Sequence, residues 1–222
     1  MIDLNKSRDF FDPSKIKMPV HIIGCGAIGS HLAETLARLG VTDIHLWDTD
    51  TVASHNIANQ MFVFNQIGMP KIEAVNDMIQ AINPGCKVTM HNAFVTTDTY
   101  LKGYVCMCVD SIAARKEIAT ATRCMPNVLA VFDFRMGLLS GQFYCADTPR
   151  RRGLLLKTMN FTDEEADAMT PRSACNFELS VVYTIKTIIG VGVNEMVRHW
   201  LGKPTHLTTI INLEDVPTIT QM

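Results

Sequence analysis

Three glycines near the start of the chain have the spacing of a phosphate-binding turn, in the segment Gly24-Cys25-Gly26-Ala27-Ile28-Gly29. In this Gly-x-Gly-x-x-Gly pattern the first two glycines let the backbone turn tightly and approach a phosphate, and the third lets the following helix pack closely. The amino terminus of that helix then holds the anion. Asp48 follows about 20 positions later, where an acidic side chain commonly binds ribose hydroxyls. The pattern predicts a nucleotide site, and its structural alternative is a bare packing turn.

Two more charged residues stand at predicted element boundaries. Lys71 lies in the first turn of a predicted helix, where the helix dipole slightly disfavours a cation unless an anion is nearby. Asp110 ends an apolar strand, at the edge where open α/β sheets bind ligands. When a carboxylate attacks phosphorus, a lysine and a carboxylate-bound metal offset the repulsion between anions. The alternatives are a solvated surface lysine and an aspartate that caps the helix beginning near Ile112.

The elements that must position these residues follow from hydrophobic periodicity. An apolar run at 19–23 predicts a buried parallel strand, and apolar residues at three- and four-residue spacing predict a helix over 27–39. With the next strand at 43–47 this is a βαβ unit with a parallel sheet. Further strands are predicted at 87–90, 104–109, 128–132, 138–144 and 206–212, and further helices at 70–82, 112–124 and 177–200.

We therefore expect one α/β domain over residues 1–222. Its fold class is Rossmann-like, with a mainly parallel, doubly wound sheet, helices on both faces and a smaller C-terminal strand and helix extension. Residues 1–18 are polar and predict an arm or short helix that packs on a neighbouring chain. Residues 148–172 contain few apolar side chains and predict a long excursion, a feature that is often functional in compact domains. Its run Arg150–Arg152 is expected to be a solvated face, with phosphate binding as the alternative.

Composition excludes several classes of protein. The chain has 47% hydrophobic and 19% charged residues, which is typical of a folded domain. Its 20 basic and 22 acidic side chains give a net charge of -2, which argues against a dedicated nucleic-acid binder. No apolar run is long enough to cross a membrane, and the first residues do not resemble a signal peptide, so we expect a cytoplasmic protein. The seven cysteines are scattered and are expected to be reduced.

An ordered series of motifs after the glycine turn carries a family resemblance. It comprises Asp48-x-Asp50-x-Val52, Asn56-Ile57-x-x-Gln60, Ile67-Gly68-x-Pro70-Lys71, Asn83-Pro84 and Val109-Asp110-Ser111. The series resembles the superfamily of ubiquitin-activating E1-like enzymes, whose bacterial members include the ThiF and MoeB types. The resemblance covers about residues 22–121 and returns at 175–202.

This resemblance implies an adenylyltransferase. Members bind ATP and Mg²⁺, activate the C-terminal carboxylate of a small ubiquitin-like or sulfur-carrier protein as an acyl-adenylate, and release pyrophosphate. It implies catalytic roles for Lys71, Asp110, Arg8 and Cys175, with Asp110 as the Mg²⁺ ligand and Cys175 as an acyl acceptor. The residues implied to bind the nucleotide are Gly24, Gly26, Ala27, Ile28, Gly29, Asp48, Asp50, Asn56, Asn59, Gln60, Lys71 and Asp110.

The sequence departs from the family pattern at two places. The arginine that usually precedes the glutamine is Asn59 here, so one phosphate-binding charge is missing. Arg8 is expected to supply charge from the arm, across the interface of a homodimer as in related dimers. Zinc-containing relatives carry two pairs of cysteines, whereas Cys145 is alone in its segment, so we expect no zinc.

Several assignments stay open on the sequence alone. Cys175 is either a nucleophile activated by a helix amino terminus and Arg172, or an ordinary helix-start cysteine. Arg135 either binds an incoming carboxylate or phosphate, or pairs with Asp133. The alternatives for the whole protein are an NAD-dependent oxidoreductase, which the segment from Gly24 to Asp48 alone would permit, and a degenerate E1-like scaffold without chemistry, which Asn59 favours. The activated carboxylate is not identified by the sequence.

Overall fold

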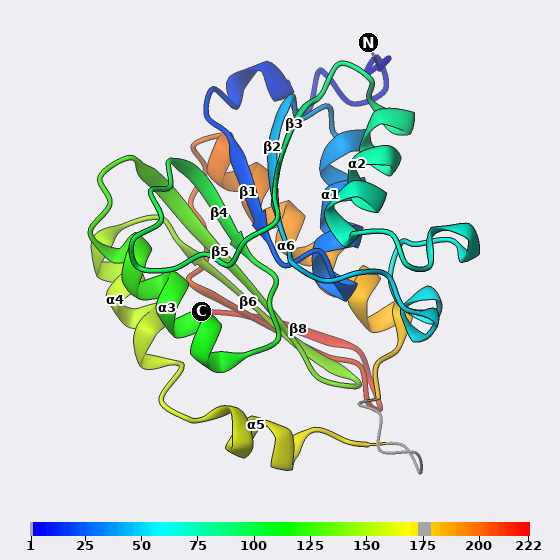
Figure 1. Cartoon of the computed structure of the whole chain (residues 1–222). Helices are drawn as coiled ribbons and strands as arrows, with labels where there is room; N and C mark the ends of the chain where they lie inside the picture. The colour runs from blue at the N-terminus through cyan, green and yellow to red at the C-terminus, as the bar shows by residue number, and fades with distance from the viewer. Residues whose placement is uncertain (1, 173–178) are drawn as a thin grey trace.

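One twisted sheet forms the centre of the molecule, and helices cover both of its faces (Figure 1). The computed structural model describes residues 2–172 and 179–222. Within this part of the chain eight strands run in the order β3-β2-β1-β4-β5-β6-β7-β8. The strands are β1 Val20–Ile23, β2 Asp43–Trp47, β3 Lys87–His91, β4 Gly103–Met107, β5 Val128–Met136, β6 Ser140–Ala146, β7 Thr208–Asn212 and β8 Thr218–Gln221.

Strands β3, β2, β1, β4 and β5 are mutually parallel, and β6, β7 and β8 are antiparallel additions. In the parallel part, Ile23 at the end of β1 pairs with Trp47 of β2 and with Met107 of β4. The residues that follow these strands therefore emerge together at one edge. This register brings the glycine turn, Asp48 and Asp110 to the same side of the sheet.

The helices divide between the two faces. They are α1 Ala27–Arg38, α2 Lys71–Ile82, α3 Ile112–Arg123, α4 Pro149–Lys157, α5 Asp163–Met169 and α6 Val182–Trp200. Helices α1, α2 and α6 pack on one face, and α3 and α4 on the other, with α5 attached to α3 (Figure 1). Because both faces are covered, every residue of β1 and β4 is buried. The predicted α/β, mainly parallel, doubly wound fold is confirmed.

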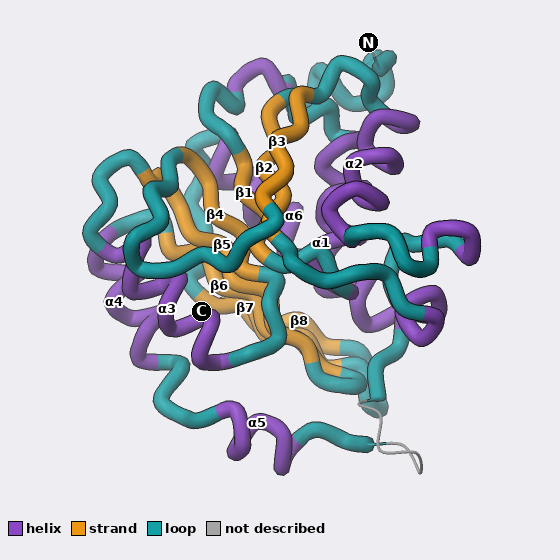
Figure 2. Tube along the Cα trace, viewed as in Figure 1, coloured by secondary structure: helices purple, strands orange, loops and turns teal. Residues whose placement is uncertain are grey.

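The segment between β2 and α2 carries little regular structure, as the sequence predicts. It contains two short 3-10 helices, η2 Ser54–Ala58 and η3 Phe64–Gln66, and projects away from the sheet (Figure 2). The N-terminal arm contains a third, η1 Pro13–Lys15. The arm packs on its own chain, because Phe11 is buried and its ring stacks on Trp200 with 5.7 Å between centroids.

Two expectations need correction, and one strand is an addition. The excursion is largely helical, since α4 and α5 lie within it, and each begins with a threonine whose side chain accepts a backbone hydrogen bond. Strand β8 is not predicted from the sequence because its residues are all exposed and show no buried face. Helix α6 begins at Val182, and the predicted start at Phe177 lies outside the described residues.

The arginine run is not a solvated face, because only Arg150 is exposed. Arg152 is 6% exposed, and its guanidinium donates to the carbonyl oxygens of Thr122 at 2.9 Å and Val128 at 2.7 Å. Arg151 donates to Asp147 and Thr205. A cation at the carboxyl end of α3 is favourable because the last carbonyl groups of a helix are otherwise unpaired. Arg151 and Arg152 therefore fasten α4 to the end of α3, to the sheet and to Thr205.

Among the described residues, no helix is long and apolar enough to span a bilayer.

Candidate functional site

The glycine turn joins β1 to α1 at the carboxyl edge of the sheet. Gly24 has φ +92°, and a Cβ there would lie 2.8 Å from the carbonyl oxygen of Cys108 on the neighbouring strand connection. A Cβ on Gly29 would lie 1.8 Å from the carbonyl oxygen of Gly24, so only glycine lets α1 pack this closely on the turn. A Cβ on Gly26 would meet no atom within 4 Å. The turn is thus tight on its inner side and open at Gly26, where a phosphate would approach.

Asp48 holds the turn in shape. Its Oδ2 accepts a hydrogen bond from the backbone N–H of Cys25 at 2.6 Å, and its Oδ1 accepts one from the N–H of Asp50 at 2.8 Å. Each carboxylate oxygen keeps a second lone pair for another donor. The ribose contact implied for Asp48 stays a prediction, and its structural role at the turn is an addition that the sequence did not indicate.

Lys71 is a buried cation at this edge. It is 8% exposed, its Nζ donates to Asp50 Oδ2 at 2.7 Å, and its backbone N–H donates to the carbonyl oxygen of Asp50 at 2.9 Å. The alternative of a solvated surface lysine is therefore wrong. Asp50 is the nearby anion that offsets the unfavourable helix dipole at the first residue of α2.

Asp110 lies exposed at the end of the β4 connection, and its Oδ1 accepts the N–H of Ser111 at 2.8 Å. The cap of α3 is Ser111, whose side chain accepts the N–H of Ala114, so the alternative of Asp110 as the cap is wrong. A second carboxylate also sits at this helix end: Asp163 of α5 accepts hydrogen bonds from the Ser111 hydroxyl at 3.0 Å and from the N–H of Ile112. Sequence reasoning missed Asp163, because it lies in a segment that gave no helical signal.

Helix η2 and the residues just after it carry the implied amide residues. Asn56 is buried, and its Oδ1 accepts the N–H of Ala53 at 2.9 Å. The side-chain amide of Asn59 donates to Ser180, just before α6, and its backbone carbonyl lies 3.3 Å from His31 Nε2. Within the described part of the chain, Asn59 Oδ1 and Gln60 Oε1 are buried without a hydrogen-bond partner. Leaving such groups unpaired costs about 1–3 kcal/mol each, which marks this loop as a place for a further donor.

Of the two remaining implied catalytic residues, Arg8 lies away from this site in its own chain, and Cys175 cannot be placed. Arg8 is exposed, and its N–H donates to the carbonyl oxygen of Leu4, whose side chain packs beside Gly40 after α1. Helix α1 has 12 residues and is about 18 Å long, so Arg8 lies at the opposite edge from the turn. Cys175 lies outside the described residues. Arg172, which was expected to act on its thiol, forms an ion pair with Asp167 at 3.5 Å.

A buried charge cluster lies beneath Asp110. Asp133 is fully buried, and Arg135 Nε donates to its Oδ2 at 2.7 Å, so of the two alternatives for Arg135 the structure has the pairing with Asp133. Arg115 of α3 donates to the other oxygen of Asp133 and to the carbonyl oxygen of Val109. The sequence indicated the pair of Asp133 and Arg135 by proximity. No sequence pattern indicated Arg115, because its partner Asp133 lies on a different element, 18 positions further along the chain.

The thiols beside the turn are unsuited to nucleophilic chemistry. Burial raises the pKa of Cys25 well above its usual range, and the nearby Asp48 carboxylate adds to this effect. Burial likewise raises the pKa of Cys108. Because the thiolate is the reactive form, these two cysteines are packing residues.

Comparison with protein families identifies the architecture. Residues 15–220 match the ThiF family, which is nearly the whole chain. The chain belongs to the ThiF family. This result confirms the resemblance to E1-like enzymes that the ordered motifs from Asp48 to Ser111 carry.

This ThiF family member is also similar to curated proteins over part of its length. Ubiquitin-like modifier-activating enzyme 5 of Caenorhabditis elegans is 33% identical over 118 residues, which cover 46% of this chain and 28% of that enzyme. tRNA threonylcarbamoyladenosine dehydratase of Escherichia coli strain K12 is 34% identical over 113 residues, covering 48% of this chain and 41% of the dehydratase. The match thus spans less than half of either relative.

Solved structures share the fold over nearly the whole chain. Escherichia coli MccB with ATP superposes with a TM-score of 0.67 and 16% identity, over 95% of this chain and 65% of MccB. PaaA superposes with a TM-score of 0.68 and 19% identity, over 99% of this chain and 69% of PaaA. At such identities the likeness shows that this ThiF family member has the E1-like fold.

Proposed function

We propose that this ThiF family member is an ATP- and Mg²⁺-dependent adenylyltransferase that activates a carboxylate. The carboxylate proposed is the C-terminus of a small ubiquitin-like or sulfur-carrier protein. Relatives support this class: one is named for activating a ubiquitin-like modifier, and MccB has been solved with ATP.

The observation that carries the proposal is the buried Lys71 ammonium, fixed by Asp50 at the edge where Gly26 and Asp110 also lie. The open space at Gly26 admits a phosphate to the backbone and to the amino terminus of α1. Asp110 is an exposed carboxylate, and oxygen ligands suit Mg²⁺. Bound ATP supplies the adenylyl group, and bound Mg²⁺ offsets the charge of its phosphates.

In this proposal each residue has a separate task. Asp48 keeps the turn in the shape that receives the phosphates and binds the ribose with its remaining lone pairs. Lys71 turns from Asp50 toward phosphate oxygens, which lowers the repulsion felt by the attacking carboxylate. Asp110 holds the metal. An NAD-dependent oxidoreductase would leave the Lys71 and Asp50 pair without a role.

The test is calorimetric binding of ATP with and without Mg²⁺, followed by pyrophosphate exchange with small carrier proteins as substrates. We expect Lys71→Met and Asp110→Ala to weaken binding of Mg-ATP by about tenfold or more, since charge-assisted contacts contribute about 1.5–3 kcal/mol. Lys87→Met and Asp98→Asn are matched controls, because both residues are exposed and lie elsewhere. Binding of NAD without ATP would overturn the proposal. Mg-ATP binding without exchange for any carrier would favour the degenerate scaffold.

Two finer proposals concern Cys175 and Arg8. We propose that Cys175 accepts the acyl group, so Cys175→Ala should keep pyrophosphate exchange and lose any thioester with the carrier. We also propose a homodimer in which Arg8 reaches the nucleotide of the second copy. Mixing Arg8→Ala with Asp110→Ala chains should then restore activity in the heterodimers, and an unchanged activity would contradict the shared site.

A further inference from the structure

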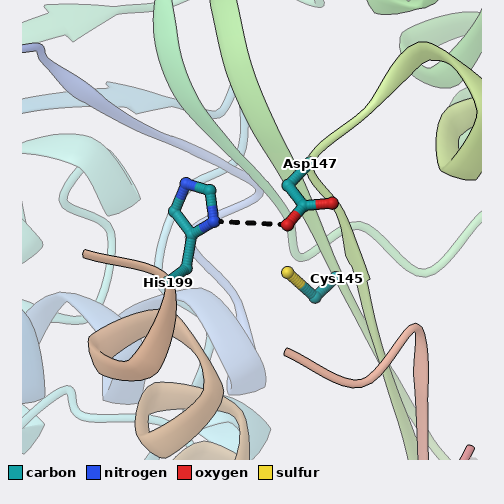
Figure 3. A group of neighbouring side chains, drawn as sticks. All are labelled: Cys145, Asp147 and His199. Carbon is teal, nitrogen blue, oxygen red and sulfur yellow. Dashed lines mark ion pairs between the residues drawn. The ribbon is translucent and has the colours of Figure 1, made fainter. Parts of the chain in front are cut away.

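A mixed group of side chains gathers at the edge of the sheet opposite the glycine turn. Strand β6 runs antiparallel to β5, so its end near Cys145 lies beside Phe132 and leads away from the nucleotide edge. Cys145 and Asp147 come from this strand end, and His199 comes from the last turn of α6 (Figure 3). The three side chains point toward one another, although His199 lies far from the other two in the sequence.

The distances fit a metal centre better than a hydrogen-bonded pair. His199 Nδ1 lies 3.5 Å from Asp147 Oδ2, which is longer than an ordinary N–H···O hydrogen bond of about 2.7–3.2 Å. Two ligands at about 2.0–2.2 Å from a tetrahedral zinc lie about 3.3–3.5 Å apart. One ligand atom of each residue, including Cys145 Sγ, lies within 4.8 Å of the other two. A small movement of the cysteine side chain would therefore complete three-point coordination.

The surroundings hold Asp147 in place and leave a path from solvent. Arg151 Nη1 donates to Asp147 Oδ1 at 3.0 Å, so the oxygen that faces away from His199 is the one engaged by the arginine. Ligating carboxylates are commonly fixed by such outer hydrogen bonds. The Thr205 hydroxyl donates to Oδ2 at 3.2 Å and keeps that oxygen directed inward. A shallow surface pocket lined by Asp147, Arg151 and Thr205 reaches the carboxylate of the group, whereas His199 does not line it and Cys145 is fully buried.

We propose that Cys145, Asp147 and His199 form a binding site for a transition-metal dication of the Zn²⁺ class. A thiolate, an imidazole and a carboxylate together suit Zn²⁺. They do not suit Mg²⁺ or Ca²⁺, which are hard cations that prefer oxygen ligands. The Cys145 thiol releases its proton to solvent as the Sγ–metal bond forms, and no oxidation is involved. With three protein ligands, water from the pocket fills the fourth position.

The proposal revises the expectation of no zinc, which depended only on the absence of paired cysteines. Two of its ligands are not cysteines, and they are brought together by the antiparallel β6 and the end of α6. Bound metal would tie this strand to the long helix that packs on it. The site lies away from the nucleotide edge, so it stands independently of the adenylyltransferase proposal.

The test uses the untagged full chain, stripped with a chelator, desalted and titrated with Zn²⁺ or Co²⁺. We expect one ion per chain, a tetrahedral Co²⁺ spectrum with a thiolate charge-transfer band, and a higher Tm with Zn²⁺. Cys145→Ser should abolish the charge-transfer band. Asp147→Asn and His199→Gln should weaken binding by more than about tenfold, since even outer partners of metal ligands contribute 10–100-fold.

Cys124→Ser is the matched control, because Cys124 is exposed on another element and should leave binding unchanged. Circular dichroism of each variant without metal separates loss of a ligand from loss of the fold. His199→Gln keeps the test valid if Cys145→Ser fails to fold. A wild-type chain that retains no stoichiometric metal, or a charge-transfer band that persists in Cys145→Ser, would overturn the proposal.

Discussion

Gly26 and Gly29 differ in the space that a side chain would find. Substitutions at the two positions should therefore affect different properties, nucleotide binding at Gly26 and stability at Gly29. A Cβ at Gly29 would collide with the backbone of Gly24, whereas one at Gly26 meets open space. We expect Gly29→Ala to lower the free energy of unfolding by about 1–3 kcal/mol, as overpacking typically does. Gly26→Ala should fold with a nearly unchanged Tm and bind Mg-ATP much more weakly, because its methyl group blocks the phosphate.

Thermal unfolding and calorimetry on the two variants measure both effects. Equal Tm losses would contradict the assignment of Gly29 to packing, and tight ATP binding by folded Gly26→Ala would contradict a phosphate at that position. Residue types and spacing are enough to predict these two roles, since each depends on atoms within a few positions of the turn.

At the scale of elements, α5 is held to the rest of the chain by few contacts. Asp163 accepts hydrogen bonds from the first residues of α3, and Lys116 of α3 donates to the carbonyl oxygen of Phe161 at 2.8 Å. Partial burial disfavours the charged form of Asp163, but the hydrogen bonds from α3 outweigh it and lower the pKa of this carboxyl. This carboxylate is therefore a polar attachment of α5 to α3, beside the packing of Ala166 on the core.

We expect Asp163→Ala to release α5 with little change in global Tm. Limited proteolysis or hydrogen exchange should show faster cleavage or exchange within residues 158–172, because removing a helix-end acceptor costs about 0.5–2 kcal/mol. Glu164→Gln, in the same turn but exposed, serves as the control. Equal protection in the wild type and in Asp163→Ala would show that other contacts hold α5.

At the scale of the whole molecule, buried histidines make the fold sensitive to acid. His21 lies in the central strand, where its Nδ1 accepts from Trp47 Nε1 at 3.1 Å and its Nε2 faces the carbonyl oxygen of Lys102. This pairing requires the neutral imidazole with its proton on Nε2. Burial lowers the pKa of His21 to about 3, and repulsion from His45 adds to this.

In the unfolded chain a histidine has a pKa of about 6.5, so between that pH and about 3 only the unfolded chain binds this proton. The free energy of unfolding should therefore fall by about 1.4 kcal/mol per pH unit from His21 alone as pH drops through this window. Burial also lowers the pKa values of four other histidines, so the free energy of unfolding should fall more steeply as the pH drops. These histidines are His31, His45, His91 and His199. Denaturant unfolding at several pH values measures the slope.

His21→Gln should flatten that slope, because an amide preserves the two hydrogen bonds without binding a proton. His55→Gln is the control, since His55 is exposed. The same slope in His21→Gln as in the wild type would mean that groups other than His21 cause the loss of stability in acid. The pattern of apolar residues predicts a buried strand at 19–23, but only the sheet shows that the His21 imidazole inside it accepts a hydrogen bond from Trp47.

The sequence alone determined the βαβ unit, the mainly parallel sheet and the family, because glycine spacing and hydrophobic periodicity are local signals; the order of the strands came from the structure. It also predicted that Asp110 lies at the ligand-binding edge of the sheet, because this residue ends an apolar strand.

Only the tertiary structure decided the long-range pairings. Three such pairings join segments that are distant in the sequence and that no sequence periodicity relates. They are the contact of Asp163 with α3, the buried pair of Arg115 and Asp133, and the approach of His199 to Cys145. Periodicity shows which face of an element is buried. It does not show which polar groups of two distant elements meet there, because that depends on how the elements pack.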